Sequence, residues 1–323
     1  MTTFIREIYP VGQGGFAYEN MGGYSIVFDC GSITSPTRVT QYINDLRAMQ
    51  NGRIDRLYIS HFDKDHVNSI TELIDNVGVK RAIIPYVPKE FRVVYNAVTN
   101  GAYSSIRETL SNRDIELNEL QEENTISEEI WEWISKPMLT MDDWNRLEYE
   151  LIREDVDPGL LNDPAYVDLK KYTINICFKT VFGPQGPNSK GLLLLSQKIC
   201  GSAFLNVLCV NGNEYNIQGT AALYTGDANL KNRQIKGEVK HFIDMRVRDS
   251  LALMQIPHHG SSDNVGCRFD IDFPASYYYY HDKSSQRLSK NQSLYNNLIG
   301  SDKLLDVRDV DFDLIEQRVE IYP

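Results

Sequence analysis

The stretch YISHFDKDHVNSI, residues 58–70, places two histidines and two aspartates within six positions, directly behind a short apolar run. These four residues are His61, Asp63, Asp65 and His66. Imidazole and carboxylate groups are ligand types that bind divalent metal ions in proteins. A solvated loop explains any one of them, but four at this spacing behind a strand predict a metal-binding segment.

Two further strand-like segments end in the same chemistry. The run AALYTGD, residues 221–227, ends at Asp227, and the run LALMQIP, residues 251–257, is followed by His258 and His259. Four of the six histidines of the chain therefore lie in two short motifs that follow apolar runs. Residues just past the carboxyl ends of neighbouring strands converge on one rim of a layered α/β fold, so we expect one dinuclear site for divalent metal ions.

Hydrophobic periodicity around these motifs predicts an α/β fold. Val39, Ile43 and Leu46 repeat at helical spacing, and Gly52 is placed to end that helix. Apolar runs bounded by turn residues predict strands at 3–12, 14–20, 24–32, 56–60, 81–87, 171–182, 221–227, 251–257 and 275–281. This order of strands and helices predicts layers of helices packed on sheets. The segment 183–191, rich in glycine and proline, is expected to form a surface loop.

Residues 90–165 differ in character, because they are acidic, helical in appearance and contain all three tryptophans. Between residues 107 and 163 there are 17 acidic and five basic residues, whereas the rest of the chain has 27 acidic and 28 basic residues. The pattern predicts a helical insertion with its own small core, since charged helical faces are usually only solvated. The alternative is a lid, or a surface at 107–163 that docks a protein partner.

The composition of the 323-residue chain is that of a globular protein, and its length fits one domain with insertions or two domains. No apolar run approaches the roughly 18 residues that a membrane span needs, and the N-terminus lacks the apolar region of a signal peptide. Five dispersed cysteines without a CxxC pattern indicate reduced thiols. We therefore expect a cytoplasmic protein with no membrane partner. The net charge of −11 arises within 107–163, so a nucleic acid is not excluded as a partner.

Taken in order, HxDxDH at 61–66, Gly-Asp at 226–227 and PHHGS at 257–261 resemble the motifs of the metallo-β-lactamase superfamily. With YPVGQGGFAYE at 9–19 and YSIVFDCGS at 24–32, the chain more narrowly resembles the nuclease-like domain of ComEC-type competence proteins, as a stand-alone soluble relative. The resemblance covers about residues 5–82 and 220–263. It implies a four-layer αββα sandwich with two metal ions at its rim. The whole chain, 1–323, would then be one domain with the helical acidic insertion, 90–165, inside it.

The resemblance also implies how the ligands are divided. His61 and Asp63 would hold one metal ion, and Asp65 and His66 would hold the other. Asp227 would bridge the two ions.

The remaining positions have auxiliary roles in the same comparison. His259, directly before the glycine, is the candidate for the remaining ligand, while His258 would either ligate a metal or act from outside the ligand set. Asp65 and His258 are the candidate catalytic residues, because Asp65 would also orient the attacking water. Asp29 would steady the ligand loop by hydrogen bonding without binding metal.

The implied chemistry is hydrolysis by a water that two divalent cations activate while they polarise a phosphoryl or acyl oxygen. Asp63 stands where much of the superfamily has histidine, which makes the site richer in oxygen. The expected cofactors are therefore two zinc or manganese ions, with magnesium as a further candidate. We expect a phosphodiesterase, in the first instance a nuclease, with a nucleic acid or nucleotide as substrate. The alternatives are a hydrolase of a small phosphoester or cyclic nucleotide, and a non-catalytic partner-binding protein.

The chain departs from the family pattern at several positions. Gly15 stands in place of an aspartate in the N-terminal motif, and Asn68 and Ser69 replace a pair of glycines behind the ligand motif. A family stretch rich in Asn and Ser has only a weak counterpart here, in Thr173 and Asn175.

The residues that contact the substrate are harder to predict from the sequence than the candidate metal ligands. Basic residues gather in 229–240 and 281–290, where they would grip phosphates or would simply form a solvated helix and loop. They are Lys231, Arg233, Lys236 and Lys240 in the first segment, and His281, Lys283, Arg287 and Lys290 in the second.

Overall fold

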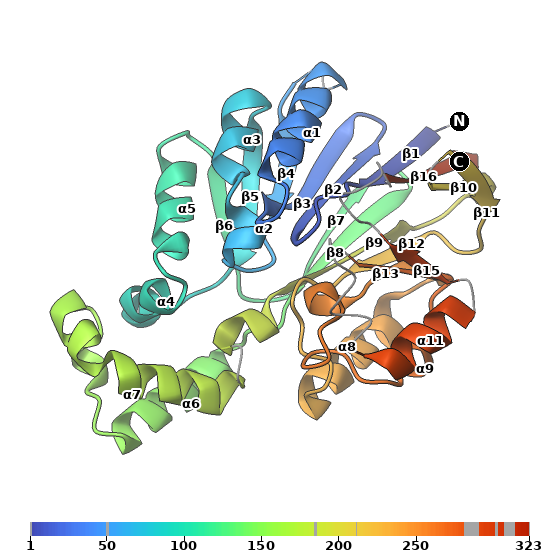
Figure 1. Ribbon diagram of the computed structural model, residues 1–323. Coiled ribbons are helices and arrows are strands. Elements are labelled where there is room, and N and C mark those ends of the chain that lie inside the picture. Colours follow the sequence, from blue (N-terminus) through green and yellow to red (C-terminus); the bar gives the residue numbers. More distant parts are fainter. Residues whose placement is uncertain are drawn as a thin grey trace.

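The computed structural model describes residues 2–49, 52–183, 186–210, 212–280, 291–300, 303–306 and 314–322. Two β-sheets pack face to face, and helices cover both outer faces (Figure 1). The four-layer αββα sandwich predicted from the sequence is therefore confirmed.

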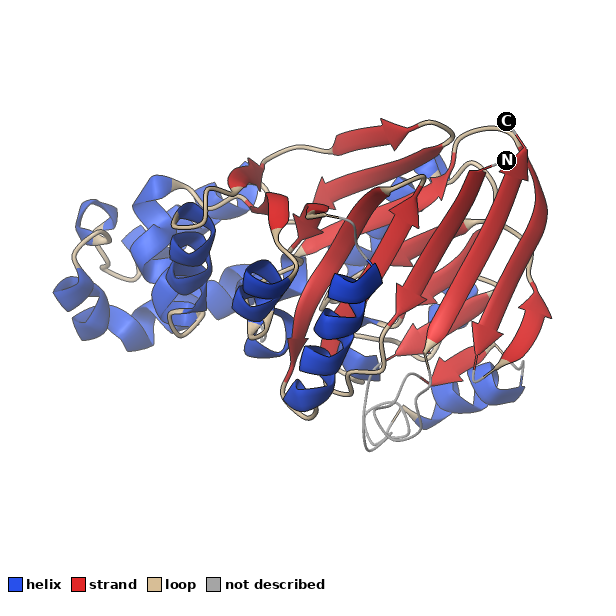
Figure 2. Ribbon diagram, turned by 90° about the horizontal axis from the view of Figure 1, so that it is seen from above, coloured by secondary structure: helices blue, strands red, loops and turns tan. Residues whose placement is uncertain are grey.

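The first sheet has nine strands in the order β11-β10-β16-β1-β2-β3-β4-β5-β6. The four strands from β3 to β6 run parallel to one another, and β1 pairs antiparallel with both β2 and β16. Because β1 and β16 are neighbours, the two ends of the chain lie side by side (Figure 2). The strands are β1 (Thr2–Ile8), β2 (Gly14–Met21), β3 (Tyr24–Ser32), β4 (Ile54–Tyr58), β5 (Val79–Pro85), β6 (Glu116–Leu120), β10 (Ser202–Val210), β11 (Asn213–Asn216) and β16 (Ile315–Tyr322).

The second sheet has seven strands in the order β15-β14-β13-β12-β9-β8-β7. The strands from β12 to β15 are parallel, and β9, β8 and β7 continue the sheet in antiparallel pairs. The strands are β7 (Asn124–Glu128), β8 (Trp131–Pro137), β9 (Leu192–Lys198), β12 (Ala221–Tyr224), β13 (Leu251–Gln255), β14 (Tyr277–Tyr280) and β15 (Leu304–Asp306).

The helices form two outer layers and one projection (Figure 1). On the nine-stranded sheet lie α1 (Pro36–Met49), α2 (Lys64–Val67), α3 (Ile70–Asn76), α4 (Arg92–Val98) and α5 (Ala102–Ser111). On the seven-stranded sheet lie α8 (Arg233–Arg246), α9 (Phe269–Asp272) and α11 (Gln292–Gly300). At one end project α6 (Met141–Arg153) and α7 (Pro164–Phe182). Short 3-10 turns are η1 (Lys89–Phe91), η2 (Pro158–Leu160), η3 (Gly186–Lys190) and η4 (Pro257–Gly260).

Strand β9 shows why the layers form. Leu192 and Leu194 point between the sheets, whereas Leu193 and Leu195 point toward the helices behind the second sheet. A strand buried on both faces needs a continuous apolar run, and each fully buried leucine contributes about 1.5–3 kcal/mol. The sequence GLLLLS thus specifies a central strand of the sandwich.

The prediction that residues 90–165 are helical is wrong for their middle part, where β6, β7 and β8 form. Trp131 and Trp133 are fully buried between the two sheets, so they belong to the main core and not to a separate one. Glutamates on β6 and β7 and in the turns beside them contributed to the acidic, helix-like appearance of the segment. Both strands lie at sheet edges, where charged side chains discourage pairing with another chain.

Two other local predictions are also wrong. Residues 171–182 belong to helix α7 and not to a strand, because Ile174, Phe178 and Val181 repeat on one buried helical face. Thr173 and Asn175 consequently lie within this helix. The expected surface loop 183–191 turns inward at η3, where the buried Lys190 Nζ lies 2.7 Å from Asp143 Oδ1.

Candidate metal centre

The candidate ligands all follow strand ends at one rim of the sandwich. His61 follows β4 of the first sheet, Asp227 follows β12 of the second, and His258 and His259 form η4 directly after β13. Asp65 and His66 lie in the single turn α2. The two sheets thus bring together the three motifs that the sequence marked as one site.

Asp227 lies at the centre of this group. His61 Nε2 lies 3.6 Å and His258 Nε2 lies 3.8 Å from Asp227 Oδ2, while His66 Nε2 lies 3.5 Å from Asp227 Oδ1. Asp63 joins the first side, since its Oδ2 is 3.8 Å from His61 Nε2. The two oxygens of one carboxylate therefore face two different sets of side chains.

The second set contains Asp65, His66 and His259. His259 Nε2 is hydrogen-bonded to Asp65 Oδ2 at 3.2 Å, and the rings of His66 and His259 are 5.9 Å apart. Two groups of buried donor atoms, each within 4.8 Å of one another, suit a metal ion. They are His61, His66 and Asp227, and Asp65, His66 and His259.

Three of the histidines are held in the same way, through Nδ1. The Nδ1 atoms of His61, His66 and His258 are each 2.8 Å from Ser60 Oγ, Asp29 Oδ2 and Asn264 Oδ1, respectively. Each ring therefore presents Nε2 to Asp227. Metal-binding histidines typically have one nitrogen anchored by a polar neighbour, which fixes the ring orientation for ligation through the other.

Asp29 steadies the ligand loop, as the sequence predicted. Its Oδ1 accepts the backbone N–H of Ser60 at 2.7 Å, and its Oδ2 accepts the Ser60 hydroxyl at 2.7 Å and contacts His66 Nδ1. Asp29 has a positive φ of 56° and is fully buried within β3. Asp29 thus binds Ser60, directly before the HxDxDH motif, and His66, the last residue of the motif.

Three buried ligand atoms lack a hydrogen bond within the described residues, and they are His61 Nε2, His66 Nε2 and Asp227 Oδ1. A buried polar atom without a partner costs about 1–3 kcal/mol, so native proteins rarely keep one without a reason. Here three such atoms converge and all belong to metal-ligand types. The donor set therefore fits divalent metal ions, by its chemistry and by its unsatisfied atoms.

The pKa values reflect the same crowding of charge. Burial opposes the charge of Asp227, but His61 and His66 outweigh it and hold the pKa of this carboxyl well below its usual range. Burial likewise opposes the charge of Asp65, yet the bond from His259 and the charge of His66 lower its pKa. Burial opposes protonation of His66, and Asp29 more than offsets this and raises its pKa well above the ordinary value. Burial raises the pKa of Asp63.

The η4 turn is strained. His258 and His259 adopt left-handed backbone conformations with φ of 48° and 51°. Such conformations cost roughly 1–2 kcal/mol for each residue other than glycine. This turn places the His258 ring beside Asp227 and the His259 ring beside Asp65, and the centroids of the two rings are 6.1 Å apart. Backbone strain at a histidine pair is consistent with a functional role.

Glycines in the sequence motifs allow the close packing around the candidate ligands. A Cβ at Gly15 would come within 2.9 Å of His66 Nδ1, and a Cβ at Gly31 within 2.6 Å of the Asp65 carbonyl oxygen. At Gly226 it would meet the Ser60 side chain at 2.9 Å. An aspartate could not replace Gly15 here without displacing His66.

Sequence reasoning missed several supporting residues. Asn264 holds His258 and also donates to the Asp227 carbonyl oxygen at 2.9 Å, and Gln255 accepts the backbone N–H groups of Thr225 and Gly226. No ligand-like motif marked them. Asn68, noted as a departure, pairs with the backbone of Ser32 through both its amide atoms and so ties α2 to β3.

The phosphate-binding alternative for the two basic segments receives little support. Lys236 and Lys240 form ion pairs with Asp272, and Lys231 and Arg233 form no ion pair with the candidate ligands among the described residues. The second basic segment, 281–290, lies outside the described residues.

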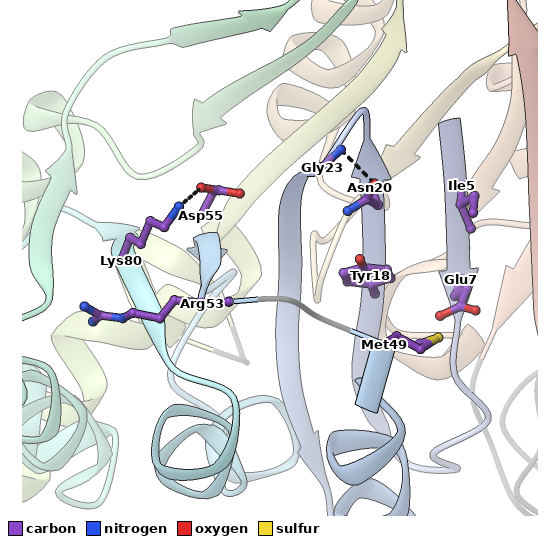
Figure 3. A pocket seen from close by; sticks show the side chains of 10 residues that line it. Ile5, Glu7, Tyr18, Asn20, Gly23, Met49, Arg53, Asp55 and Lys80 are labelled. Atoms are coloured by element: carbon purple, nitrogen blue, oxygen red, sulfur yellow. Dashed lines mark hydrogen bonds and ion pairs between the residues drawn. The ribbon is translucent and has the colours of Figure 1, made fainter. Parts of the chain in front are cut away.

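A separate cavity of about 470 Å³ lies near the amino-terminal ends of β4 and β5 (Figure 3). Its polar groups already have partners, since Asp55 accepts Lys80 Nζ at 2.6 Å and the Ser25 N–H at 2.8 Å. None of the candidate ligands lines it. We therefore do not assign chemistry to it.

Among the described residues, no helix has both the length and the apolar character to cross a membrane.

Comparisons with known proteins give structural neighbours only. A scan against models of protein families finds no match, and no curated protein matches the chain. Similar solved structures include the metallo-β-lactamase fold protein YhfI from Bacillus subtilis, with 10% identity, 97% of this chain and 99% of that one covered, and a TM-score of 0.49. The metallo hydrolase Igni18 from Ignicoccus hospitalis has 10% identity, 97% and 98% coverage and a TM-score of 0.46.

A third neighbour is CmlA, a diiron β-hydroxylase from Streptomyces venezuelae, with 12% identity and a TM-score of 0.49. The alignment covers 99% of this chain and 54% of that one, so the chain spans about half the length of CmlA. These neighbours include proteins of the metallo-β-lactamase fold. The αββα assignment rests on the chain's own sheets and cores.

Proposed function

We propose that the protein is a metal-dependent hydrolase that cleaves phosphodiester bonds, with a nucleic acid or nucleotide as substrate. The observation that carries this proposal is the set of three buried ligand atoms without hydrogen bonds, on His61, His66 and Asp227. The resemblance of the N-terminal and HxDxDH motifs to ComEC-type nuclease-like domains supports the phosphodiesterase assignment, as does the carboxylate of Asp63 in a position often held by histidine.

The proposed division keeps His61 and Asp63 for one ion and Asp65, His66 and His259 for the other. The cluster of Asp65, His66 and His259 supports the second set. The other cluster joins His61 with both His66 and Asp227, and Asp63 approaches His61 at 3.8 Å. His258 shares with His61 both its anchored Nδ1 and its approach to Asp227 Oδ2. We therefore assign His258 as a further ligand of the first ion, in preference to a role as proton donor. A lower affinity for one of two bound ions in His258→Asn would support this.

Two divalent cations bound there would supply an activated water and neutralise charge on the phosphoryl group. The chain's own residues do the positioning. Asp65 stays ionised near neutral pH because its pKa is lowered, so it remains available to accept a hydrogen bond from the attacking water. Asp29 and Asn264 keep the imidazoles in the orientation that ligation requires.

One experiment tests the activity. Purified protein is incubated with Mn²⁺, Mg²⁺ or Zn²⁺ and with single-stranded DNA, double-stranded DNA, RNA and bis-p-nitrophenyl phosphate. We expect turnover with at least one metal, and its loss in Asp65→Ala. The absence of turnover with every metal, or unchanged turnover in the variant, would contradict the proposal. Elemental analysis and anomalous scattering test the ligands independently, because metal bound elsewhere would overturn the site.

A protein partner at 107–163 is a second proposal, supported by one observation. Tyr149 and Ile152, three residues apart on α6, are 67% and 59% exposed, although large apolar side chains usually avoid such exposure in clusters. A partner captured by the wild type and lost with Tyr149→Ser/Ile152→Ser, while turnover persists, would support it. Equal capture by both proteins would contradict it.

A further inference from the structure

A second cavity, of about 440 Å³, opens directly beside the candidate metal centre. It lies between the ligand loop with α2 on one side and the turn that joins α4 to α5 on the other. Asp63, a candidate ligand, is part of its wall. Pockets for small ligands have volumes of about 300–1,000 Å³, so this one has room for a single small group and not for a duplex.

The floor of the cavity is apolar. Phe62, Val67 and Ile106 line it and are buried. The Phe62 ring is fixed by edge-on contacts with Tyr95 and Tyr103, at centroid distances of 5.9 and 5.2 Å. An apolar floor of this kind suits packing against the flat, apolar face of a heteroaromatic base.

The rim of the cavity is polar and carries one cation. Thr71, Asn100 and Ser105 are exposed, and their side chains form no hydrogen bond within the described part of the chain. Lys64 is also exposed and has no ion pair there. Hydroxyl and amide groups match the polar edges of a base and a sugar, and one lysine matches the charge of one phosphate. A long polyanion would need several cations.

We propose that this cavity is a subsite for one nucleoside, which it holds next to the phosphoryl group at the metal centre. This inference rests on the proposed function and deepens it. It predicts that the substrate is recognised one nucleotide at a time, as in a single strand, a chain end or a small nucleotide diester, and that base-paired duplex is a poor substrate.

The test is direct binding. Titration calorimetry measures the affinity of the manganese-loaded protein for adenosine 5′-monophosphate, cytidine 5′-monophosphate and inorganic phosphate. We expect the nucleotides to bind at least tenfold more tightly than phosphate. In Ser105→Trp, whose indole would fill the cavity from the rim, we expect this advantage to fall to within twofold. Thr71→Trp fills the cavity from the other side and serves if Ser105→Trp does not fold.

The matched control is Ser111→Trp, because Ser111 is exposed on the same helix and does not line the cavity. It should keep the full advantage of nucleotides over phosphate. Equal affinities for nucleotide and phosphate in the wild type would overturn the subsite, as would an advantage that survives both cavity-filling variants. Turnover of bis-p-nitrophenyl phosphate separates the two proposals. Turnover without a nucleotide advantage overturns the subsite alone, whereas absent turnover overturns the proposed function.

Discussion

Two of the buried polar clusters in the described part of the chain differ in the hydrogen bonding of their atoms. The inter-sheet cluster, centred on Arg6 and Glu19, lies between the sheets, and every charged atom in it has a protein partner. Arg6 Nε donates to Glu19 at 2.6 Å, and Tyr224, Ser196 and Trp133 donate to the same carboxylate. In the candidate metal centre at the rim, His61, His66 and Asp227 are also buried, yet each keeps a side-chain atom without a hydrogen bond.

The difference separates structure from function. A fully satisfied polar network stabilises one arrangement of the sheets and leaves no atom for a ligand. At the candidate metal centre, His61 and His66 make only ion-pair contacts of 3.6 and 3.5 Å with Asp227 through their Nε2 atoms, and no hydrogen bond. Asp29, Ser60 and Asn264 hold the imidazoles of the centre in place. Buried polarity therefore does not by itself mark a site, whereas converging unsatisfied ligand atoms do. Four substitutions would break or sharpen this contrast.

The largest effect is expected at the centre of the metal site. Asp227→Asn removes the carboxylate that both ligand sets face, so we expect turnover to fall at least 10³-fold, about 4 kcal/mol of transition-state stabilisation. Elemental analysis should show metal loss. Asp249→Asn, at an exposed aspartate, is the control and should retain activity. Full metal content with full activity in Asp227→Asn would remove this residue from the site.

A substitution in the inter-sheet cluster should lower the stability of the protein and leave its metal binding unchanged. Glu19→Gln leaves the Arg6 charge buried without its counter-charge, and we expect the free energy of unfolding to fall by about 3 kcal/mol. Urea denaturation measures this, and the exposed Glu108→Gln is the control. Unchanged stability, or metal loss from a protein that remains folded, would show that the two clusters are not separate in function.

A smaller effect is expected where the VGQGG motif contacts a candidate ligand. Gly15→Ala places a methyl group within 2.9 Å of His66 Nδ1 and must displace the ring from Asp29. We expect metal affinity to fall about 10–100-fold, the usual cost of disturbing the residues that orient a ligand. Competition with a chelator measures it. Gly266→Ala, where a Cβ would meet nothing within 4 Å, should bind metal as the wild type does.

The sequence was sufficient to predict that the candidate ligands meet at one rim, and to predict most of the parallel strands, because both depend on local patterns. HxDxDH, Gly-Asp and the histidine pair each follow an apolar run, and α/β layering brings such ends to one rim. The double-sided burial of β9 is likewise visible in four consecutive leucines.

What the sequence did not predict depends on contacts between distant segments. The glutamates of β6 and β7 suggested helices because nothing local shows that these strands lie at sheet edges. Helix α7 was mistaken for a strand because its β-branched residues outweighed its helical period. Asn264 is 37 residues from Asp227, whose carbonyl it binds, and no spacing rule connects them.

The smallest effect is expected at Glu7, a buried carboxylate with one hydrogen-bond partner among the described residues, for which the measured quantity is the dependence of stability on pH. Glu7 lines the cavity in Figure 3 and accepts a hydrogen bond from Tyr9 at 2.6 Å. Burial raises its pKa above 4.5, although the Tyr9 bond opposes this. The protonated form thus favours folding, so this contribution is present below about pH 4.5 and is lost as pH rises through the raised pKa.

Glu7→Gln keeps an acceptor for Tyr9 and removes the charge. We expect the variant to be more stable than the wild type at pH 7, by at most about 1 kcal/mol, and to lose this advantage near pH 4. Urea denaturation at both pH values gives the difference, and Glu108→Gln should show no such pH dependence. If the difference in stability between Glu7→Gln and the wild type is the same at both pH values, the buried charge of Glu7 is compensated by its partners as well as that of Glu19. Of the three sites compared, only the candidate metal centre would then contain buried polar atoms that lack compensation.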